Sequence, residues 1–134
     1  ELYSAHIYLA MAAYFEAKNL RGFAHWMKIQ YKEEVSHAMK MFEYLSDRGV
    51  KVLLQAIPQP ALDFSSALEV FEETLKHEQK VTGLIHALYE LAQKNSDHAS
   101  SVFLQWFISG CGCWFPASSS MLLCYRNILC SFSH

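Results

Sequence analysis

The first 110 residues contain no cysteine, and all four cysteines lie in the last quarter of the chain. A domain without disulfides gains its stability from packing, and such domains are typical of a reducing compartment. We therefore expect a cytoplasmic protein. No apolar stretch approaches the length of a membrane span, and no basic run carries interleaved aromatic residues. We therefore expect neither a membrane nor a nucleic acid as a partner.

Strong charge is almost absent from the end of the chain. From Ser109 to His134 there is no Asp, Glu or Lys, and Arg126 is the only strong charge. The whole chain has 52% hydrophobic and 18% charged residues, which is the composition of a compact globular protein. We therefore expect one helical domain over residues 1–109, followed by an atypical Cys/Ser-rich apolar tail over residues 110–134.

Apolar residues at helical spacing predict four helices. The first runs from Glu1 to about Lys18, and a short break at Asn19–Gly22 brings the second helix back antiparallel to the first. The second helix continues to Asp47-Arg48, and Gly49 is a natural stop signal. Because the chain opens at Glu1 within a helical pattern, we expect further residues to precede it in the native protein.

A long connection separates the second helix from the third. Residues 50–64 include two prolines and cannot be helical throughout, so they can cross the whole bundle and leave helices two and three parallel. Ser66, with Glu69 three residues later, is a capping-box pattern for the third helix, and Asn95–Asp97 caps the fourth. Two short connections flanking one long crossover predict an all-α four-helix bundle.

An acid and an imidazole stand in the middle of a helix stripe that should face the core. The stripe on the second helix consists of Phe23, Met27, Gln30, Glu34, His37, Met41 and Tyr44. Burying Glu34 and His37 is costly unless they are paired or bind a metal, and at i and i+3 both can reach one ion. Glu1 on the first helix and Glu78 on the third occupy matching inward positions.

Each of these residues alone has a simpler explanation. Glu1 or Glu78 can be a helix-end residue that reaches solvent, and Glu34 with His37 can be a buried ion pair. Together, three acids and one histidine on inward stripes favour a metal site. Oxygen-rich ligation with one imidazole suits iron or manganese better than structural zinc, and the ligand types do not choose between these two metals. Glu33 is either solvated or a ligand for an outer ion.

Other polar and aromatic residues are weaker candidates. Tyr8 shares the stripe of Glu1 and is either plain core or a phenol that bonds a ligand or supplies an electron beside a redox metal. Trp106 is interpreted as packing. The remaining histidines show no paired spacing and are expected on solvated faces; they are His6, His25, His77, His86 and His98.

Several segments together resemble the bacterial-type non-haem ferritins. The likeness covers residues 1–109 and rests on Glu1-Leu-Tyr-Ser, Gly22-Phe-Ala-His-Trp, Glu33-Glu34-Val-Ser-His37-Ala-Met, Leu75-Lys-His-Glu78-Gln and Phe103-Leu-Gln-Trp106-Phe. The resemblance implies a ferritin-like four-helix bundle. It also implies oxidation of Fe(II) by dioxygen or peroxide, followed by storage of ferric oxide inside a shell of many subunits.

The resemblance also implies a role for each candidate residue. The ligands of the implied di-iron centre are Glu1, Glu34, His37 and Glu78. In that family pattern Glu34 bridges the two irons, and Glu33 corresponds to a ligand of a third, outer iron. Tyr8 corresponds to the tyrosine beside the centre, and Trp106 to a neighbouring tryptophan.

The sequence departs from the family pattern after Ser109. Cys111 and Trp114 fall where the family has a Gln and a Glu near the second and third irons. Pro116 would end the fourth helix early, and the fifth, shell-closing helix has no counterpart. We interpret this change as a frameshift, an altered splice or a chimeric join, and we expect it to impair shell assembly.

The sequence thus predicts a ferroxidase and iron-storage subunit. The alternative is a non-catalytic or defective ferritin-like subunit that only packs. A rubrerythrin-like peroxidase would need a second Glu-x-x-His on the fourth helix, which the sequence does not contain. A cytokine-like bundle gives no reason for inward-facing acids.

Overall fold

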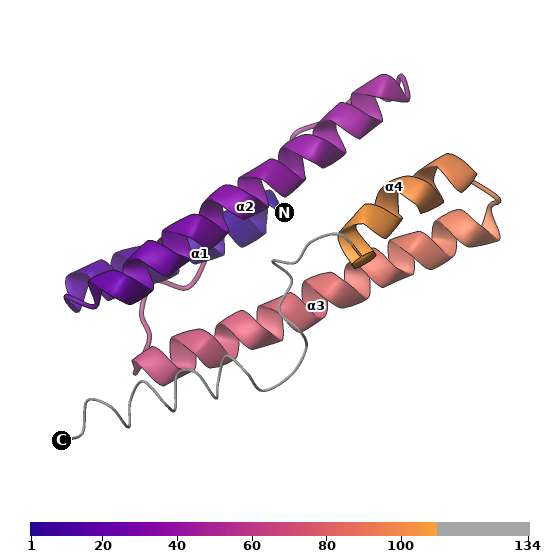
Figure 1. Ribbon diagram of the computed structural model, residues 1–134. Coiled ribbons are helices and arrows are strands. Elements are labelled where there is room, and N and C mark those ends of the chain that lie inside the picture. Colours follow the sequence, from indigo (N-terminus) through magenta and orange to yellow (C-terminus); the bar gives the residue numbers. More distant parts are fainter. Residues whose placement is uncertain (110–134) are drawn as a thin grey trace. The chain divides into compact units, whose positions relative to one another are not determined.

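A computed structural model describes residues 1–109 as four helices joined by two turns and one long connection (Figure 1). The helices are α1 (Leu2–Ala17), α2 (Arg21–Asp47), α3 (Ala67–Lys94) and α4 (His98–Ser109). The described residues contain no strand, which confirms the predicted all-α class. The predicted tail over residues 110–134, with Cys111, Trp114 and Pro116, lies outside the described residues.

Three helices end in the same backbone motif, in which one residue adopts a left-handed conformation. These residues are Asn19 (φ 58°), Gly49 (φ 71°) and Ser96 (φ 53°). At the end of α1, the Asn19 N–H donates to the Glu16 carbonyl at 3.0 Å, and the Leu20 N–H donates to the Phe15 carbonyl at 2.9 Å. This pair of bonds is the Schellman motif, which reverses the chain and ends the helix sharply. The predicted stop at Gly49 is confirmed.

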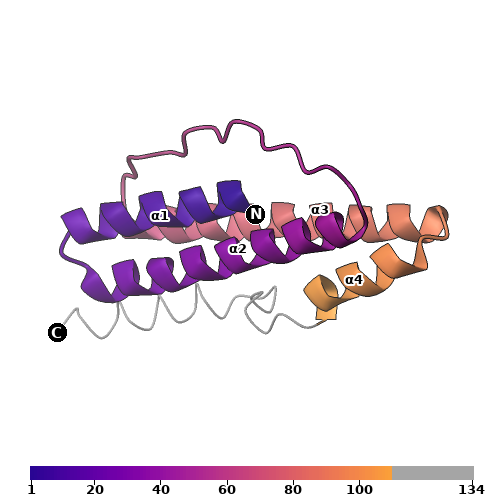
Figure 2. The same cartoon turned by 90° about the horizontal axis from the view of Figure 1, so that it is seen from above.

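The first compact unit, Glu1–Ala67, contains the antiparallel pair α1 and α2 (Figure 1, Figure 2). Its buried apolar residues are Ala5, Tyr8, Met11, Ala12, Phe15, Ala24 and Met27. The turn at Asn19 sets the register, because residues equally distant from it along the two helices face each other. The rings of Phe15 and Phe23 accordingly lie 5.3 Å apart between centroids. The same register brings Glu1 level with His37.

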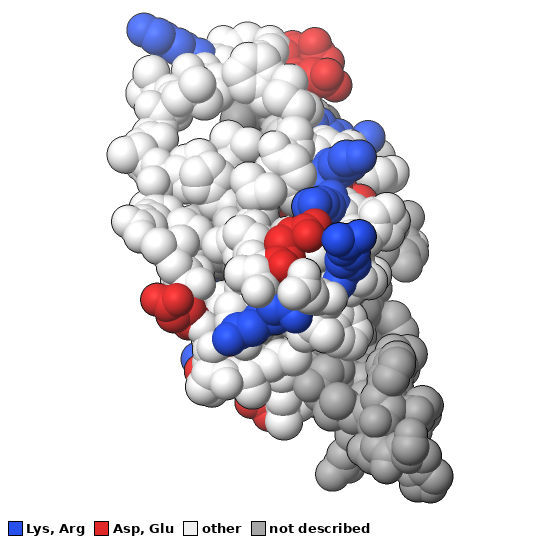
Figure 3. Space-filling model, turned by 90° about the vertical axis from the view of Figure 1, so that its left-hand side faces the viewer, with Lys and Arg blue, Asp and Glu red and all other residues white. Residues whose placement is uncertain are grey.

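An ion pair also links the two helices near their turn. Lys28 Nζ lies 2.7 Å from Glu16 Oε1, and both side chains are about half exposed. Exposed pairs of this kind contribute little to stability, so the buried rings nearby supply most of the cohesion. Figure 3 shows basic and acidic side chains intermingled on one face of the molecule, with wide uncharged areas around them.

The connection between α2 and α3 covers residues 48–66 and contains no helix, as the prolines predicted (Figure 2). Some of its apolar side chains face solvent, with Leu53 70% and Leu54 79% exposed. No helix within residues 1–109 combines the length and the apolar character that crossing a bilayer requires.

The second unit begins at Leu68 and includes α3 and α4. Asp97 caps α4: its Oδ1 accepts a hydrogen bond from the Ser100 N–H at 3.1 Å, and its Oδ2 accepts one from the Ser100 hydroxyl at 2.7 Å. The predicted cap at Asn95–Asp97 is therefore confirmed. Helical spacing predicts one stripe of Ser100, Leu104 and Phe107 on the fourth helix, and α4 indeed buries Leu104 and Phe107.

Some predicted positions were wrong by a small margin. Gly22 lies in the first turn of α2 and not in the break, because the Schellman motif at Asn19 completes the reversal within a few residues. Helical spacing predicts that Leu68 lies on the inward stripe of α3, but Leu68 is 38% exposed, whereas Val70 and Thr74 are buried. The Thr74 hydroxyl donates a hydrogen bond of 2.8 Å to the Val70 carbonyl one turn earlier on the same helix. Because this bond satisfies the hydroxyl within α3, a polar residue can occupy the buried face.

Replacing Asp97 by Ala should destabilise the second unit, because it removes the side-chain acceptor for the Ser100 amide at the start of α4. Loss of an N-cap typically costs about 1 kcal/mol of unfolding free energy. Urea unfolding followed by circular dichroism measures this loss. Asp97→Asn is the control, because it keeps an acceptor oxygen and should retain most of the stability. Equal losses in both variants would contradict the capping role.

Candidate metal centre

Three side chains from the first unit converge on one point. Glu1, Glu34 and His37 each place one potential ligand atom within 4.8 Å of the other two. Glu1 is the N-cap residue of α1, and Glu34 and His37 lie one turn apart on α2. The antiparallel register explains the convergence, because the distance from Asn19 back to Glu1 matches the distance forward to His37. The structure thus brings together three of the residues that the spacing selected.

The three side chains lie in a setting that strongly disfavours isolated charges. Glu34 and His37 are only 6% and 5% exposed. Both carboxylate oxygens of Glu1 are buried and accept no hydrogen bond from residues 1–109. The distance between Glu34 Oε2 and His37 Nδ1 is 4.0 Å, which is longer than a hydrogen bond. Two buried carboxylates this close repel each other, and a bound cation would relieve that repulsion.

Burial lowers the pKa of the His37 imidazole below its ordinary value, since the surroundings disfavour its charged form. The negative charges of Glu1 and Glu33 act in the opposite direction and raise this pKa, but burial is the larger effect. His37 is therefore neutral at neutral pH. A neutral imidazole has a nitrogen lone pair available, which is the form that binds metals.

The donor set fits a hard divalent cation. Two carboxylates and one imidazole provide oxygen-rich ligation, which suits iron or manganese, and the described residues place no thiolate in the cluster. The two acids also supply the negative charge that would balance a divalent ion. The donors therefore match the metals that the sequence predicted.

Glu33 takes a different position from its neighbour. It does not belong to the cluster of three, and its Oε2 accepts a hydrogen bond of 2.8 Å from the Gln30 side-chain amide. Its role as a ligand of an outer ion stays a prediction. Sequence reasoning placed Gln30 on the inward stripe but assigned it no role. The sequence could have indicated a role for Gln30, because it is a third polar residue on that stripe, one turn before Glu34.

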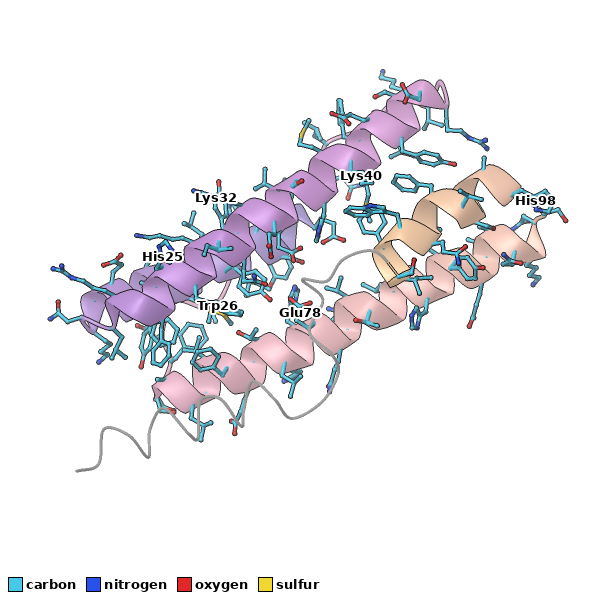
Figure 4. All side chains as sticks on the ribbon, in the orientation of Figure 1. His25, Trp26, Lys32, Lys40, Glu78 and His98 are labelled. Atoms are coloured by element: carbon cyan, nitrogen blue, oxygen red, sulfur yellow. The ribbon has the colours of Figure 1, made fainter. Side chains whose placement is uncertain are left out.

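Tyr8 lies in the core of the first unit and is 0% exposed. Its ring packs edge-on against Trp26 on α2, with ring centroids 6.4 Å apart and an interplanar angle of 79°. Trp26 is labelled in Figure 4, on the same helix as Glu34. This packing supports the reading of Tyr8 as core, and a role beside a metal stays a prediction.

The other candidates lie in the second unit or at the surface. Glu78 is half-buried on α3 (Figure 4), and its membership in the metal site stays a prediction from the resemblance. Trp106 on α4 packs against the ring of Phe107 at 4.9 Å, in agreement with a packing role. His25 and His98, both labelled in Figure 4, are exposed as expected. Of the remaining histidines, His6 and His86 are exposed and His77 is half-buried.

Comparisons with known proteins point to one family. The family model described as the ferritin-like domain matches residues 1–110. The bacterial non-heme ferritin of Staphylococcus saprophyticus is 45% identical over 108 residues, which cover 81% of this chain and 65% of that protein. Its counterpart in Staphylococcus aureus is 42% identical over the same shares. The chain thus spans about two thirds of the length of these relatives.

Solved structures give the same result for the fold. An open-pore ferritin from the archaeon Archaeoglobus fulgidus matches with a TM-score of 0.79 and 45% identity, over 81% of this chain and 66% of that one. A humanized archaeal ferritin matches with a TM-score of 0.86 and 40% identity, over 95% of this chain and 76% of that one. These matches confirm the predicted four-helix bundle class with its long crossover.

Replacing Glu34 by Gln should have opposite effects without and with metal. In the metal-free protein the neutral amide removes a buried like-charge repulsion and should raise the unfolding free energy by roughly 1 kcal/mol. Excess Co(II), at about 100 times its Kd, should stabilise the parent by about 2.7 kcal/mol and the variant hardly at all. Urea unfolding with and without Co(II) measures both effects. Glu43→Gln, at an exposed acid on the same helix, should match the parent.

The lowered pKa of His37 predicts that the metal-free protein loses stability in mild acid. The unfolded chain binds a proton at the ordinary histidine pKa, whereas the folded chain resists it, so unfolding becomes easier as pH falls below about 6.5. His37→Gln should flatten the dependence of the urea midpoint on pH between about pH 7 and about pH 5. His25→Gln, at an exposed position, should not. Parallel profiles for all three proteins would refute this assignment.

Proposed function

Because the chain belongs to the ferritin family, we propose that it binds Fe(II) at Glu1, Glu34 and His37 and acts as a ferroxidase and iron-storage subunit. The family supports iron binding and storage in general. The assignment of these three residues, and the oxidation of iron by this chain, are the proposal.

One observation supports the proposal most directly. The buried Glu1 carboxylate accepts no hydrogen bond from residues 1–109 and lies beside the buried side chains of Glu34 and His37. A fold that only needed packing would place apolar residues at these positions, since an apolar replacement of buried charges often stabilises a protein. The alternative, a non-catalytic structural subunit, gives no reason for this cost. The buried cluster therefore favours a metal-binding function.

The proposed reaction uses Fe(II) as substrate. Glu1 and Glu34 bind the cation through carboxylate oxygens, and His37, neutral at neutral pH, binds it through a ring nitrogen. Carboxylates stabilise the more highly charged Fe(III) more than Fe(II), so they favour loss of an electron. Each Fe(II) gives up one electron, and the reduction of dioxygen to hydrogen peroxide takes two electrons and two protons. Two Fe(II) ions are therefore consumed for each dioxygen, and peroxide can itself serve as an oxidant.

Storage and assembly are also part of the proposal. Deposition of ferric oxide requires an enclosed volume, and the family resemblance implies that this volume arises from self-association into a shell. Several large apolar side chains of the first unit are exposed and could be covered by other subunits, among them Met39, Phe42 and Leu45. The cytoplasmic location and the roles of Glu33, Glu78 and Tyr8 stay predictions.

Replacing Glu34 by Ala should abolish rapid iron oxidation, because it removes a carboxylate from the cluster. The protein is loaded anaerobically with about two Fe(II) per chain and then exposed to air, and the ferric absorbance is followed. We expect the parent to oxidise iron at least about tenfold faster than the variant. Glu43→Ala, which removes an exposed acid from the same helix, is the matched control and should behave as the parent. Equal slow rates in all three would indicate background oxidation and a non-catalytic subunit.

A further inference from the structure

Trp26 is an aromatic side chain that the proposed reaction does not use. It lies on α2 and is half-buried (Figure 4). Its ring contacts Tyr8 edge-on, with ring centroids 6.4 Å apart, a usual separation for such a pair. Tyr8 itself is 0% exposed. The contact therefore joins a fully buried phenol to an indole that solvent can partly reach.

The buried cluster, Tyr8 and Trp26 follow one another along the helix pair. The antiparallel register of α1 and α2 places Tyr8 level with Gln30. Gln30 lies one turn after Trp26 and one turn before Glu34, and each step rises by about 6 Å. Side chains of a helix lean toward its N-terminus, so the Tyr8 phenol leans toward Glu1. Tyr8 thus lies between the proposed iron ligands and Trp26.

Peroxide creates a demand for single electrons at the cluster. Reduction of one hydrogen peroxide to two waters takes two electrons and two protons, whereas one Fe(II) supplies one electron. Without a second donor, the peroxide splits into hydroxide and a hydroxyl radical, which attacks nearby side chains. With the phenol as donor, one Fe(II), the Tyr8 phenol, one hydrogen peroxide and one proton give one Fe(III), the Tyr8 phenoxyl radical and two waters. The phenoxyl radical must then be reduced.

We propose that Trp26 returns an electron to Tyr8 and passes the oxidised state on to a one-electron reductant in solution. Trp26 gives up one electron and its indole N–H proton, and the Tyr8 phenoxyl oxygen takes up one electron and one proton. A reductant of the ascorbate class then restores the indole with one electron and one proton. Electron transfer slows steeply with distance, so two rings in contact suit this step. The inference rests on the proposed binding of Fe(II) at Glu1, Glu34 and His37.

Pulse radiolysis of the metal-free full chain tests the electron path between the two rings. Azide radicals oxidise tryptophan, and transfer to tyrosine, the reverse direction through the same contact, appears as a rise of tyrosyl absorbance. Tyr8→Phe and Trp26→Phe should each remove the same concentration-independent part of this transfer, and the double variant should remove no more. Tyr14→Phe, at a tyrosine of α1 that packs against Phe64, should match the parent. Unchanged transfer in both variants would refute the path.

The lifetime of the radical during iron oxidation tests the role of Trp26 in the reaction. The full chain is loaded anaerobically with equimolar Fe(II), mixed with hydrogen peroxide and ascorbate, and freeze-quenched for electron paramagnetic resonance. The part of the tyrosyl signal that Tyr8→Phe removes should last severalfold longer in Trp26→Phe than in the parent. The reason is that the buried radical has lost its route to ascorbate. Tyr14→Phe is again the matched control and should keep the lifetime of the parent.

The two measurements separate this inference from the iron site itself. If the metal-free transfer occurs but Fe(II) is oxidised no faster with the protein than in buffer, the iron site is wrong and the path between the rings stands. If the protein oxidises iron and the Tyr8-dependent signal decays equally fast in Trp26→Phe and the parent, the role of Trp26 is refuted. Absence of any Tyr8-dependent signal in Trp26→Phe would refute it as well.

Discussion

The antiparallel register of α1 and α2 is the constraint on which the rest of the site depends. A Schellman motif centred on Asn19 reverses the chain within a few residues, and the aromatic pair Phe15 and Phe23 lies directly beyond the turn. From there, each residue of α1 has a defined opposite position on α2. Glu1 reaches Glu34 and His37 only because this register is maintained along the whole of α1. A turn one residue longer would rotate Glu1 away from the cluster.

At the cluster of Glu1, Glu34 and His37, fold stability and the proposed metal-binding function make opposite demands. Two carboxylates and an imidazole occupy positions on the inner face of the helix pair where apolar side chains would pack without cost. The neighbouring residues Ala5, Tyr8 and Met27 are almost fully buried and supply the packing that tolerates this local destabilisation. A bound cation would convert the repulsion into attraction, so metal binding and folding of the first unit are thermodynamically linked. The charges are thus costly for the fold, and the proposed iron chemistry would account for their presence.

The sequence predicted most of this arrangement because the informative patterns are local. Helical spacing placed Glu34 and His37 on one inward turn, and the short break at Asn19 predicted the antiparallel return that brings Glu1 to them. Helical spacing could not predict the orientation of the Glu33 side chain, because its carboxylate has neighbours both before and after it along the helix. Only the structure shows that it contacts Gln30. The exposure of Leu68 and the burial of Thr74 on α3 likewise depend on packing that spacing does not specify. The roles of Glu78 and Tyr8 in the metal site were implied by the family resemblance and stay predictions.

The most direct test of the central claim is a crystal structure of the Co(II)-loaded chain, with the metal located by its anomalous scattering. We expect one strong peak bonded to Glu1 and Glu34 oxygens and to a His37 nitrogen, at about 2.0–2.2 Å from each, the range of such bonds to a similar divalent ion. A peak elsewhere, or none at this cluster in a fully loaded crystal, would contradict it. In that case the buried acids would be a feature of a ferritin fold without a metal-binding role in this chain.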